Sequence, residues 1–193
     1  TQAILDVGIS HVIYGAKDPN PDHAGRAEMD LKSAGVTVTT GVCEQECQLL
    51  IAAFTKVQRT GLPWVIMKSA LSLDGRITRT PNESQWLTSP ASRERVQQLR
   101  FDCDAIMTGG NTARIDDPSL TLRSARLPKK KQPWRMIVTK GTKSELPADL
   151  QLFTDDHADR TLVQESGDLH AALRTLVEKG CNSVLVEAGG TLM

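Results

Sequence analysis

The sequence lacks an excess of charge of either sign. Its 193 residues carry 23 Lys and Arg against 23 Asp and Glu, so the formal net charge is +0 at pH 7. No global electrostatic field therefore attracts nucleic acid or an anionic membrane surface, and a bound phosphate must be held by a few local cations and backbone N–H groups. We expect neither a nucleic acid nor a membrane as a partner.

Long apolar runs and clustered metal ligands are missing as well. No stretch approaches the roughly 20 apolar residues that a helix needs to cross a bilayer, and no basic and then apolar leader follows Thr1. The cysteines Cys43, Cys47, Cys103 and Cys181 include no CxxC pair, and no further Cys or His lies at zinc-site spacing from the first two. We predict reduced structural or surface thiols, no bound metal and a cytoplasmic location.

What is present is the composition of an ordinary globular protein, with 39% hydrophobic and 24% charged residues. The first part of the chain predicts a buried strand over residues 11–16 and a second strand over 36–42. Helices are expected at 24–34 and 43–59. This order indicates a piece of an open α/β sheet, and the turn residues at 60–63 form the natural domain boundary.

Strands and helices alternate again after this boundary. Ser89 and Pro90 predict the start of a helix over residues 89–100, because Ser caps N-termini well and Pro suits the first helical position. A second helix is expected over 168–179 and a short element near 150–153. The expected strands are residues 64–70, 105–107, 135–139, 160–163 and 183–187. The second part is therefore expected to be an α/β domain. We also expect the sequence to be a fragment of a longer chain at both of its ends.

Two glycine turns follow predicted strands, at residues 108–112 and 187–191. Such turns bind phosphates in open α/β folds because their backbone N–H groups are free to point at oxygen atoms. Neither turn matches the G-x-G-x-x-G fingerprint, and a tight turn into a helix explains them equally well.

Charged side chains at strand and helix ends are further candidates for a site. Lys68 ends an apolar strand, where it either extends to solvent from an edge strand or presents a cation to a substrate carbonyl or phosphate. Asp74 is a candidate proton donor, although Asp-Gly is also ordinary turn chemistry. Arg100 and Arg123 have the fork geometry that suits a phosphate monoester, although a lone arginine is more often a solvated surface residue.

Four motifs stand in order along the second part: KSALSLDGRI, ESQWLTSPASRERVQQLR, DAIMTGGNTARIDDPSLTLR and VEAGGTL. They resemble the reductase domain of the bifunctional diaminohydroxyphosphoribosylaminopyrimidine deaminase/5-amino-6-(5-phosphoribosylamino)uracil reductase family. The stretch DPNPDHAGR at 18–26 is similar to the end of the same family's deaminase domain. The resemblance implies the C-terminal part of a cytidine-deaminase-like α/β domain over 1–60. A dihydrofolate-reductase-like α/β reductase domain follows over 61–193, incomplete at its C-terminus.

The resemblance also implies the ligands and their residues. The implied cofactor is NADPH, and zinc belongs only to the deaminase part that this sequence lacks. Substrate-binding residues would be Lys68, Ser84, Arg100, Leu120, Arg123 and Glu187. Cofactor-binding residues would be Ala70, Trp86, Thr112, Asp116, Gly189, Gly190, Thr191, Leu192 and Met193. Lys140 departs from the family pattern, and the four histidines match no motif position.

The expected reaction is the reduction of 5-amino-6-(5-phosphoribosylamino)uracil to the ribitylamino product in riboflavin biosynthesis. Arg100 and Arg123 would clamp the ribose phosphate, Glu187 would accept hydrogen bonds from the hydroxyls, and Lys68 and Asp74 stay candidates for the catalytic group. Two alternatives stay open: a pteridine reductase on the same scaffold and a nucleotide-binding module without chemistry. A homodimer is common among reductases of this kind.

Overall fold

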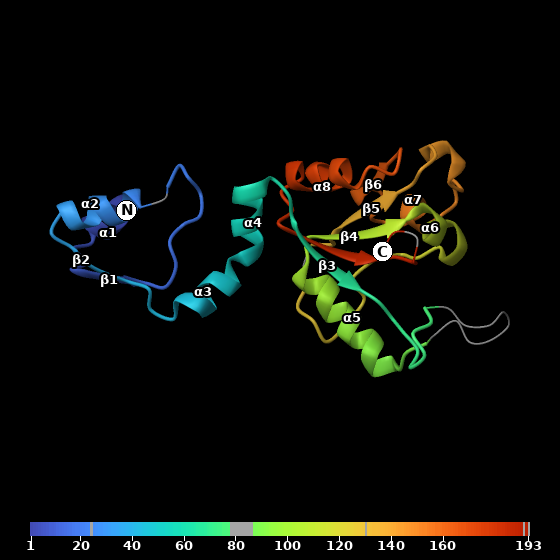
Figure 1. Ribbon diagram of the computed structural model, residues 1–193, viewed down its shortest axis with the longest axis horizontal. Coiled ribbons are helices and arrows are strands. Elements are labelled where there is room, and N and C mark those ends of the chain that lie inside the picture. The colour runs from blue at the N-terminus through green and yellow to red at the C-terminus, as the bar shows by residue number, and fades with distance from the viewer. Residues whose placement is uncertain (24, 78–86, 130, 191, 193) are drawn as a thin grey trace. The chain divides into compact units, whose positions relative to one another are not determined.

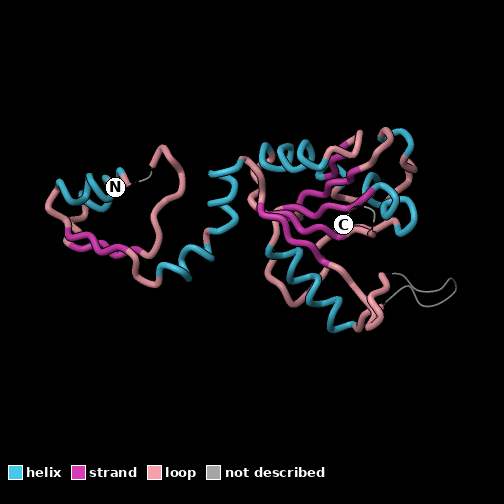
Figure 2. The backbone as a smooth tube through the Cα atoms, viewed as in Figure 1, coloured by secondary structure: helices cyan, strands magenta, loops and turns pink. Residues whose placement is uncertain are grey.

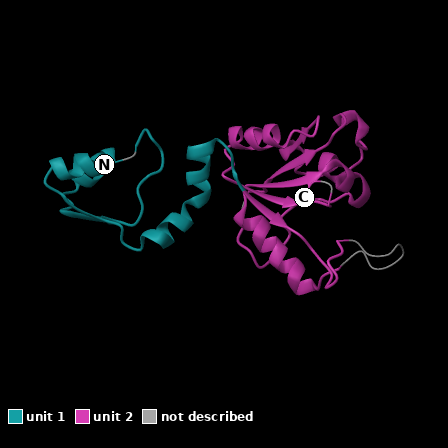
Figure 3. Ribbon diagram, viewed as in Figure 1, with its two compact units in different colours: residues 1–64 teal, residues 65–193 magenta. Residues whose placement is uncertain are grey.

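The computed structural model describes residues 1–23, 25–77, 87–129, 131–190 and 192. The chain divides into two compact units, Thr1–Trp64 and Val65–Met193 (Figure 3). Within the described residues, no helix combines the length and the apolar character needed to cross a membrane.

The first unit is built around a pair of short parallel strands. Its elements are α1 (Gln2–Asp6), β1 (His11–Tyr14), α2 (Arg26–Ser33), β2 (Thr37–Thr40), α3 (Glu44–Leu50) and α4 (Ala52–Thr60). The strand predicted over residues 11–16 is present as β1, but the prediction that it is buried was wrong, because β1 pairs with β2 in a two-stranded sheet and its residues alternate between exposed and half-buried. The helix expected over 43–59 is two helices, because Ile51 leaves helical geometry with φ −101° and ψ 11°.

The second unit contains a five-stranded sheet with the order β3-β7-β4-β5-β6 (Figures 1 and 2). The pairs β4–β7, β4–β5 and β5–β6 are parallel. The strands are β3 (Trp64–Lys68), β4 (Ala105–Gly109), β5 (Trp134–Val138), β6 (Thr161–Gln164) and β7 (Ser183–Glu187). The helices are α5 (Pro90–Asp102), α6 (Gly110–Asp116), α7 (Gln151–Thr154) and α8 (Leu169–Glu178), with 3-10 turns η1 (Lys143–Glu145) and η2 (Ala158–Arg160).

Side-chain alternation gives the sheet two buried faces. Met107, Met136 and Val184 pack with Leu176 of α8 on one face. The opposite face holds a second core of residues from β4, β5, α6, α7 and the segment after α6. These residues are Ile106, Ala113, Leu120, Ile137, Leu146, Leu150 and Leu152. Figure 1 shows α8 and α5 on opposite sides of the sheet. A strand that is covered on both faces has a nearly continuous apolar sequence, as expected for a parallel sheet.

The start of α5 confirms the capping prediction. The Ser89 hydroxyl accepts a hydrogen bond from the Ser92 backbone N–H at 3.2 Å, and Pro90 is the first helical residue. The helix therefore begins where the sequence placed it, and it runs on to Asp102.

The carboxyl ends of β4 and β7 lie side by side. Met107 pairs with Val186 in the parallel ladder, so the residues that follow each strand meet at the same edge of the sheet. Gly110 is required there, because a Cβ atom at this position would lie 2.8 Å from the Cβ of Thr139. The sequence thus brings both glycine turns to one edge, where ligands bind in open α/β sheets.

Candidate functional site

Glu187, Arg100 and Lys68 form an ion-pair cluster at this edge, which we name the Glu187 cluster. Arg100 in the last turn of α5 donates from Nε to Glu187 Oε1 at 2.6 Å and from Nη2 to Oε2 at 3.2 Å. Lys68, the last residue of β3, donates from Nζ to Glu187 Oε2 at 3.4 Å. Lys68 thus comes from β3 and Glu187 from the neighbouring strand β7, and α5 supplies the Arg100 guanidinium.

The Glu187 cluster is largely closed to solvent on the arginine side. The Arg100 and Glu187 side chains are each 9% exposed, whereas Lys68 is 25% exposed. Arg100 also donates from Nη1 to the Thr121 carbonyl at 3.0 Å, so all three of its nitrogens are bound within the protein. Two cations share one carboxylate, and the ammonium of Lys68 is the cation that solvent or a ligand reaches.

Beside the cluster, the turn after β7 contacts the helix after β4. The Gly189 N–H donates to the Thr112 hydroxyl at 3.3 Å, and the Leu192 N–H donates to the Gly189 carbonyl at 3.1 Å. A Cβ on Gly190 would lie 3.4 Å from Ile77 Cδ1, which brings the KSALSLDGRI segment to the same place. All four sequence motifs therefore have residues at this edge of the sheet, because Arg100 of the second motif binds Glu187.

The glycines at this edge suit a dinucleotide. Gly109 ends β4 and Gly110 begins α6, and Gly189 and Gly190 lie shortly after β7, so the backbone carries no Cβ atom at these four positions. Backbone that lacks Cβ atoms lets a pyrophosphate approach closely. The residues present therefore fit the cofactor that the sequence resemblance implies.

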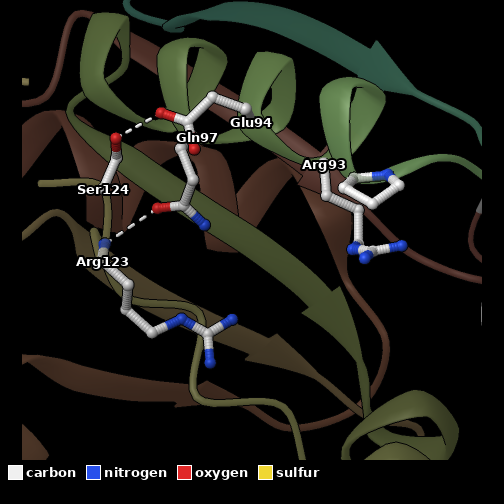
Figure 4. A pocket seen from close by; sticks show the side chains of 6 residues that line it. Arg93, Glu94, Gln97, Arg123 and Ser124 are labelled. Atoms are coloured by element: carbon white, nitrogen blue, oxygen red, sulfur yellow. Dashed lines mark hydrogen bonds between the residues drawn. The ribbon is translucent and has the colours of Figure 1, made fainter. Parts of the chain in front are cut away.

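A pocket of about 320 Å³ lies beside α5 (Figure 4). Its lining residues come from α5 and from the segment that follows β4 and α6: Pro90, Arg93, Glu94, Gln97, Arg123 and Ser124. Gln97 Oε1 accepts from the Arg123 backbone N–H at 2.8 Å, and the Ser124 hydroxyl donates to Glu94. Figure 4 shows the Arg123 side chain extending away from both of these contacts, which leaves its guanidinium exposed.

The structure places the two arginines of the predicted phosphate clamp in different surroundings. Arg123 shares its pocket with Arg93, whereas Arg100 is tied to Glu187 and to a backbone carbonyl. Arg93 itself donates to the Thr88 carbonyl at 2.9 Å. A buried guanidinium requires partners, and for Arg100 these are Glu187 and the Thr121 carbonyl.

The remaining predicted site residues lie in different surroundings. Leu120 is buried in the second core with φ 49°, Ala70 is half-buried after β3, and Asp116 is exposed at the end of α6. Thr112 and Leu192 contact the Gly189 turn as described above. Four predicted residues lie outside the described part of the chain, namely Ser84, Trp86, Thr191 and Met193.

Asp74 belongs to an exposed turn. It accepts a hydrogen bond from the Ser72 hydroxyl and pairs with Arg76 Nε at 2.9 Å. The Ser72 hydrogen bond holds the pKa of Asp74 below its ordinary value. Asp74 is therefore ionised at neutral pH, and its contacts are those of a turn residue, with Gly75 next to it at φ 80°.

Sequence reasoning missed Arg93 and Gln97 as pocket residues. Helical spacing would have pointed to them, because residues 93, 97 and 100 are separated by four and three positions and thus share one side of α5. The side chain of Ser124 carried no such signal, because it lies beyond the last residue of the matched motif.

The cysteines and acidic residues give no sign of a metal centre. Within the described residues, no three His, Cys, Asp or Glu side chains are grouped as metal ligands would be. Cys103 and Cys181 are buried, and burial raises the pKa of the Cys181 thiol to about 12. Both residues therefore belong to the interior of the second unit.

Comparison with known proteins identifies the family. The model of the RibD C-terminal domain matches residues 63–193. The chain belongs to this family. The riboflavin biosynthesis protein RibD of Synechocystis is 36% identical over 214 residues, which cover 100% of this chain and 57% of the relative. That of Escherichia coli is 31% identical, with 98% and 59% covered. The resemblance drawn from the four motifs is confirmed.

Solved structures agree with this assignment. RibD of Acinetobacter baumannii superimposes with a TM-score of 0.87 at 33% identity, covering 99% of this chain and 58% of that one. A diaminohydroxyphosphoribosylaminopyrimidine deaminase/5-amino-6-(5-phosphoribosylamino)uracil reductase from Thermotoga maritima gives a TM-score of 0.81 at 28% identity, covering 98% and 56%. The predicted α/β fold is thus confirmed for the part with the parallel sheet. The chain spans a little over half the length of these relatives.

Proposed function

We propose that the second unit is an NADPH-dependent reductase that converts 5-amino-6-(5-phosphoribosylamino)uracil to the ribitylamino product in riboflavin biosynthesis. The observation that carries this proposal is the position of the Glu187 cluster. It presents Lys68 beside the Gly189–Gly190 turn at the carboxyl edge of the sheet. The family membership of residues 63–193 and the activity named for the Thermotoga relative support the same reaction.

The residues of the chain would bind and orient the reactants. NADPH, when bound, supplies the hydride that reduces C1 of the opened ribose. The backbone N–H of Gly190 suits its pyrophosphate, while the Gly189 N–H donates to the Thr112 hydroxyl and holds the turn in place. Lys68 is the open cation of the cluster and would donate hydrogen bonds to the substrate, with Glu187 fixing the position of its ammonium. Positioning of this kind is worth about 7–11 kcal/mol of a reaction barrier.

Arg123 is the proposed phosphate-binding residue. Its guanidinium is exposed at a pocket that Arg93 also lines, and its backbone is held by Gln97. An exposed planar fork is suited to a phosphate monoester. Pteridines carry no sugar phosphate, so this pocket favours the phosphorylated substrate over the pteridine alternative.

For the first unit we propose the end of a cytidine-deaminase-like domain. The zinc ligands of that domain would belong to residues outside this sequence, and the reductase unit would have the dihydrofolate-reductase-like arrangement. The proposed partners are the phosphorylated small-molecule substrate and, in a homodimer, a second copy of the protein. A cytoplasmic location is part of the same proposal.

The test is a reductase assay with a matched arginine control. The chain should oxidise NADPH in the presence of the phosphorylated substrate and not with a pteridine. Arg123→Ala should raise KM at least about tenfold with kcat little changed, as expected for the loss of a charged hydrogen bond worth about 1.5–3 kcal/mol. Arg126→Ala, which removes a nearby exposed arginine, should leave KM unchanged. Equal KM values for the Arg123 variant and the parent chain would refute the phosphate assignment.

A further inference from the structure

The segment that presents Arg123 is irregular and contains strained backbone. We name residues 117–123 the Arg123 loop; it follows α6 and belongs to no helix or strand. Asp117 and Leu120 have φ of 38° and 49°, a left-handed conformation that residues with a side chain rarely adopt. Such a conformation persists only when the surroundings enforce it. At the beginning of the loop, Asp117 Oδ1 accepts from the Gln151 backbone N–H at 2.7 Å, and its carbonyl accepts from Gln151 Nε2 at 2.7 Å.

Two buried guanidinium groups hold the middle of the Arg123 loop. Arg135 of β5 donates from Nη1 to the Ser119 carbonyl at 3.0 Å, and Arg100 of α5 donates from Nη1 to the Thr121 carbonyl at 3.0 Å. These two carbonyls flank Leu120, whose side chain is buried in the second core. The strained residue is therefore fixed on both sides by side chains from distant elements.

Gln132 holds the end of the loop, next to Arg123. Its Oε1 accepts from the Leu122 backbone N–H at 2.7 Å, and its Nε2 donates to the Leu122 carbonyl at 3.1 Å. One primary amide thus pairs with both backbone groups of a single residue, as a neighbouring strand would. The following backbone N–H, that of Arg123, is bonded to Gln97. The peptide that carries the Arg123 side chain is thereby fixed from two sides.

We propose that Gln132 is a positioning residue that orients Arg123 toward the phosphate of the substrate. Gln132 does not line the pocket, so it acts through the backbone that it holds. Without its amide, the last part of the loop loses two hydrogen bonds, and Arg123 must be ordered when the ligand binds. Ordering on binding lowers affinity without changing the contacts made in the complex. This proposal rests on the assignment of Arg123 to phosphate made above.

The experiment measures binding of ribose 5-phosphate as the probe by calorimetry. Gln132→Ala should weaken binding about tenfold and leave the affinity for NADPH unchanged. Gln132→Met, which keeps the side-chain volume but forms no amide hydrogen bonds, should weaken it equally. The control Gln98→Ala removes a glutamine whose amide donates to Asp102 of the same helix at 2.9 Å, and this variant should bind as the parent chain does. In the reductase assay, KM should rise with kcat unchanged.

A double-mutant cycle separates positioning from general damage to the fold. In the Arg123→Ala background, Gln132→Ala should cause no further loss, because its effect passes through Arg123. An equal loss in both backgrounds would overturn the proposal and leave Gln132 with a structural role only. If Arg123→Ala weakens the binding of ribose 5-phosphate but Gln132→Ala does not, the positioning role alone is refuted. If Arg123→Ala changes nothing, the phosphate site fails, and the role of Gln132 fails with it.

Discussion

Glu187→Met removes the carboxylate that faces Arg100 and Lys68. The Arg100 side chain is 9% exposed, so its charge would stay buried without a counter-ion, whereas Lys68 at 25% exposed would be partly solvated. Removing one partner of a buried pair costs about 3–5 kcal/mol, and the partial exposure of Lys68 places the expected loss near the lower end, about 3 kcal/mol. For an urea slope of about 2 kcal/mol per molar, the unfolding midpoint should fall by about 1.5 M.

The assay is urea unfolding of four proteins: the parent chain, Glu187→Met, Arg100→Met and the double variant. The double variant should regain most of the stability lost in Glu187→Met, because it no longer buries an unpaired guanidinium. Such a cycle measures the coupling between the two side chains, expected to exceed about 2 kcal/mol for a buried pair with two direct hydrogen bonds. Additive losses, or a midpoint for Glu187→Met within error of the parent, would show that this contact does not stabilise the fold.

Three further substitutions test other contacts. The hydrogen bond from Arg135 lowers the pKa of Asp155, so this carboxylate stabilises the fold above about pH 4 and loses its effect as pH falls through the folded-state pKa. Asp155→Asn should therefore lose about 2 kcal/mol at pH 7 and much less at pH 3 in urea unfolding; an equal loss at both would contradict this. The buried hydroxyl of Thr108 has no hydrogen-bond partner in the described part of the chain. Thr108→Val should therefore leave the free energy of unfolding unchanged or raise it by up to about 1 kcal/mol. A clear decrease would show that the hydroxyl does form a hydrogen bond. Ser89→Ala should cost about 1 kcal/mol through the lost bond to the Ser92 N–H, and Ser89→Asp should restore the thermal midpoint.

The parts of the fold that sequence alone predicted are those with local causes. The start of α5 follows from Ser89 and Pro90, and the last strand was predicted with its observed limits, residues 183–187. The errors have non-local causes. Whether residues 11–14 are buried depends on what covers β1, and the hydrophobic pattern of the strand carries no information about that. The break at Ile51 also lacks a local signal, because no Gly or Pro marks it.

The candidate site was predictable as a set of motifs but not as a set of contacts. The two glycine turns and Lys68 were named from the sequence as separate candidates, and the structure brings Lys68, Thr112 and Gly189 to one edge of the sheet. The ion pair of Arg135 with Asp155 carries no signal in the sequence. Arg135 lies in an apolar strand and is 1% exposed, and its partner Asp155 follows 20 residues later in a segment without any motif.

Arg100 shows why a motif position does not define a role. An arginine can bind a phosphate of the substrate or form an ion pair within the protein. The residue type and its position in the helix do not distinguish these two roles. The choice depends on whether a carboxylate lies within reach, and Glu187 is 87 positions away in sequence yet 2.6 Å away in space. Because Glu187 and the Thr121 carbonyl already bind its guanidinium, Arg100 influences the site by fixing Glu187 and the Arg123 loop. Arg123 is exposed, so of the two arginines that the resemblance assigned to the ribose phosphate we expect Arg123 to bind it.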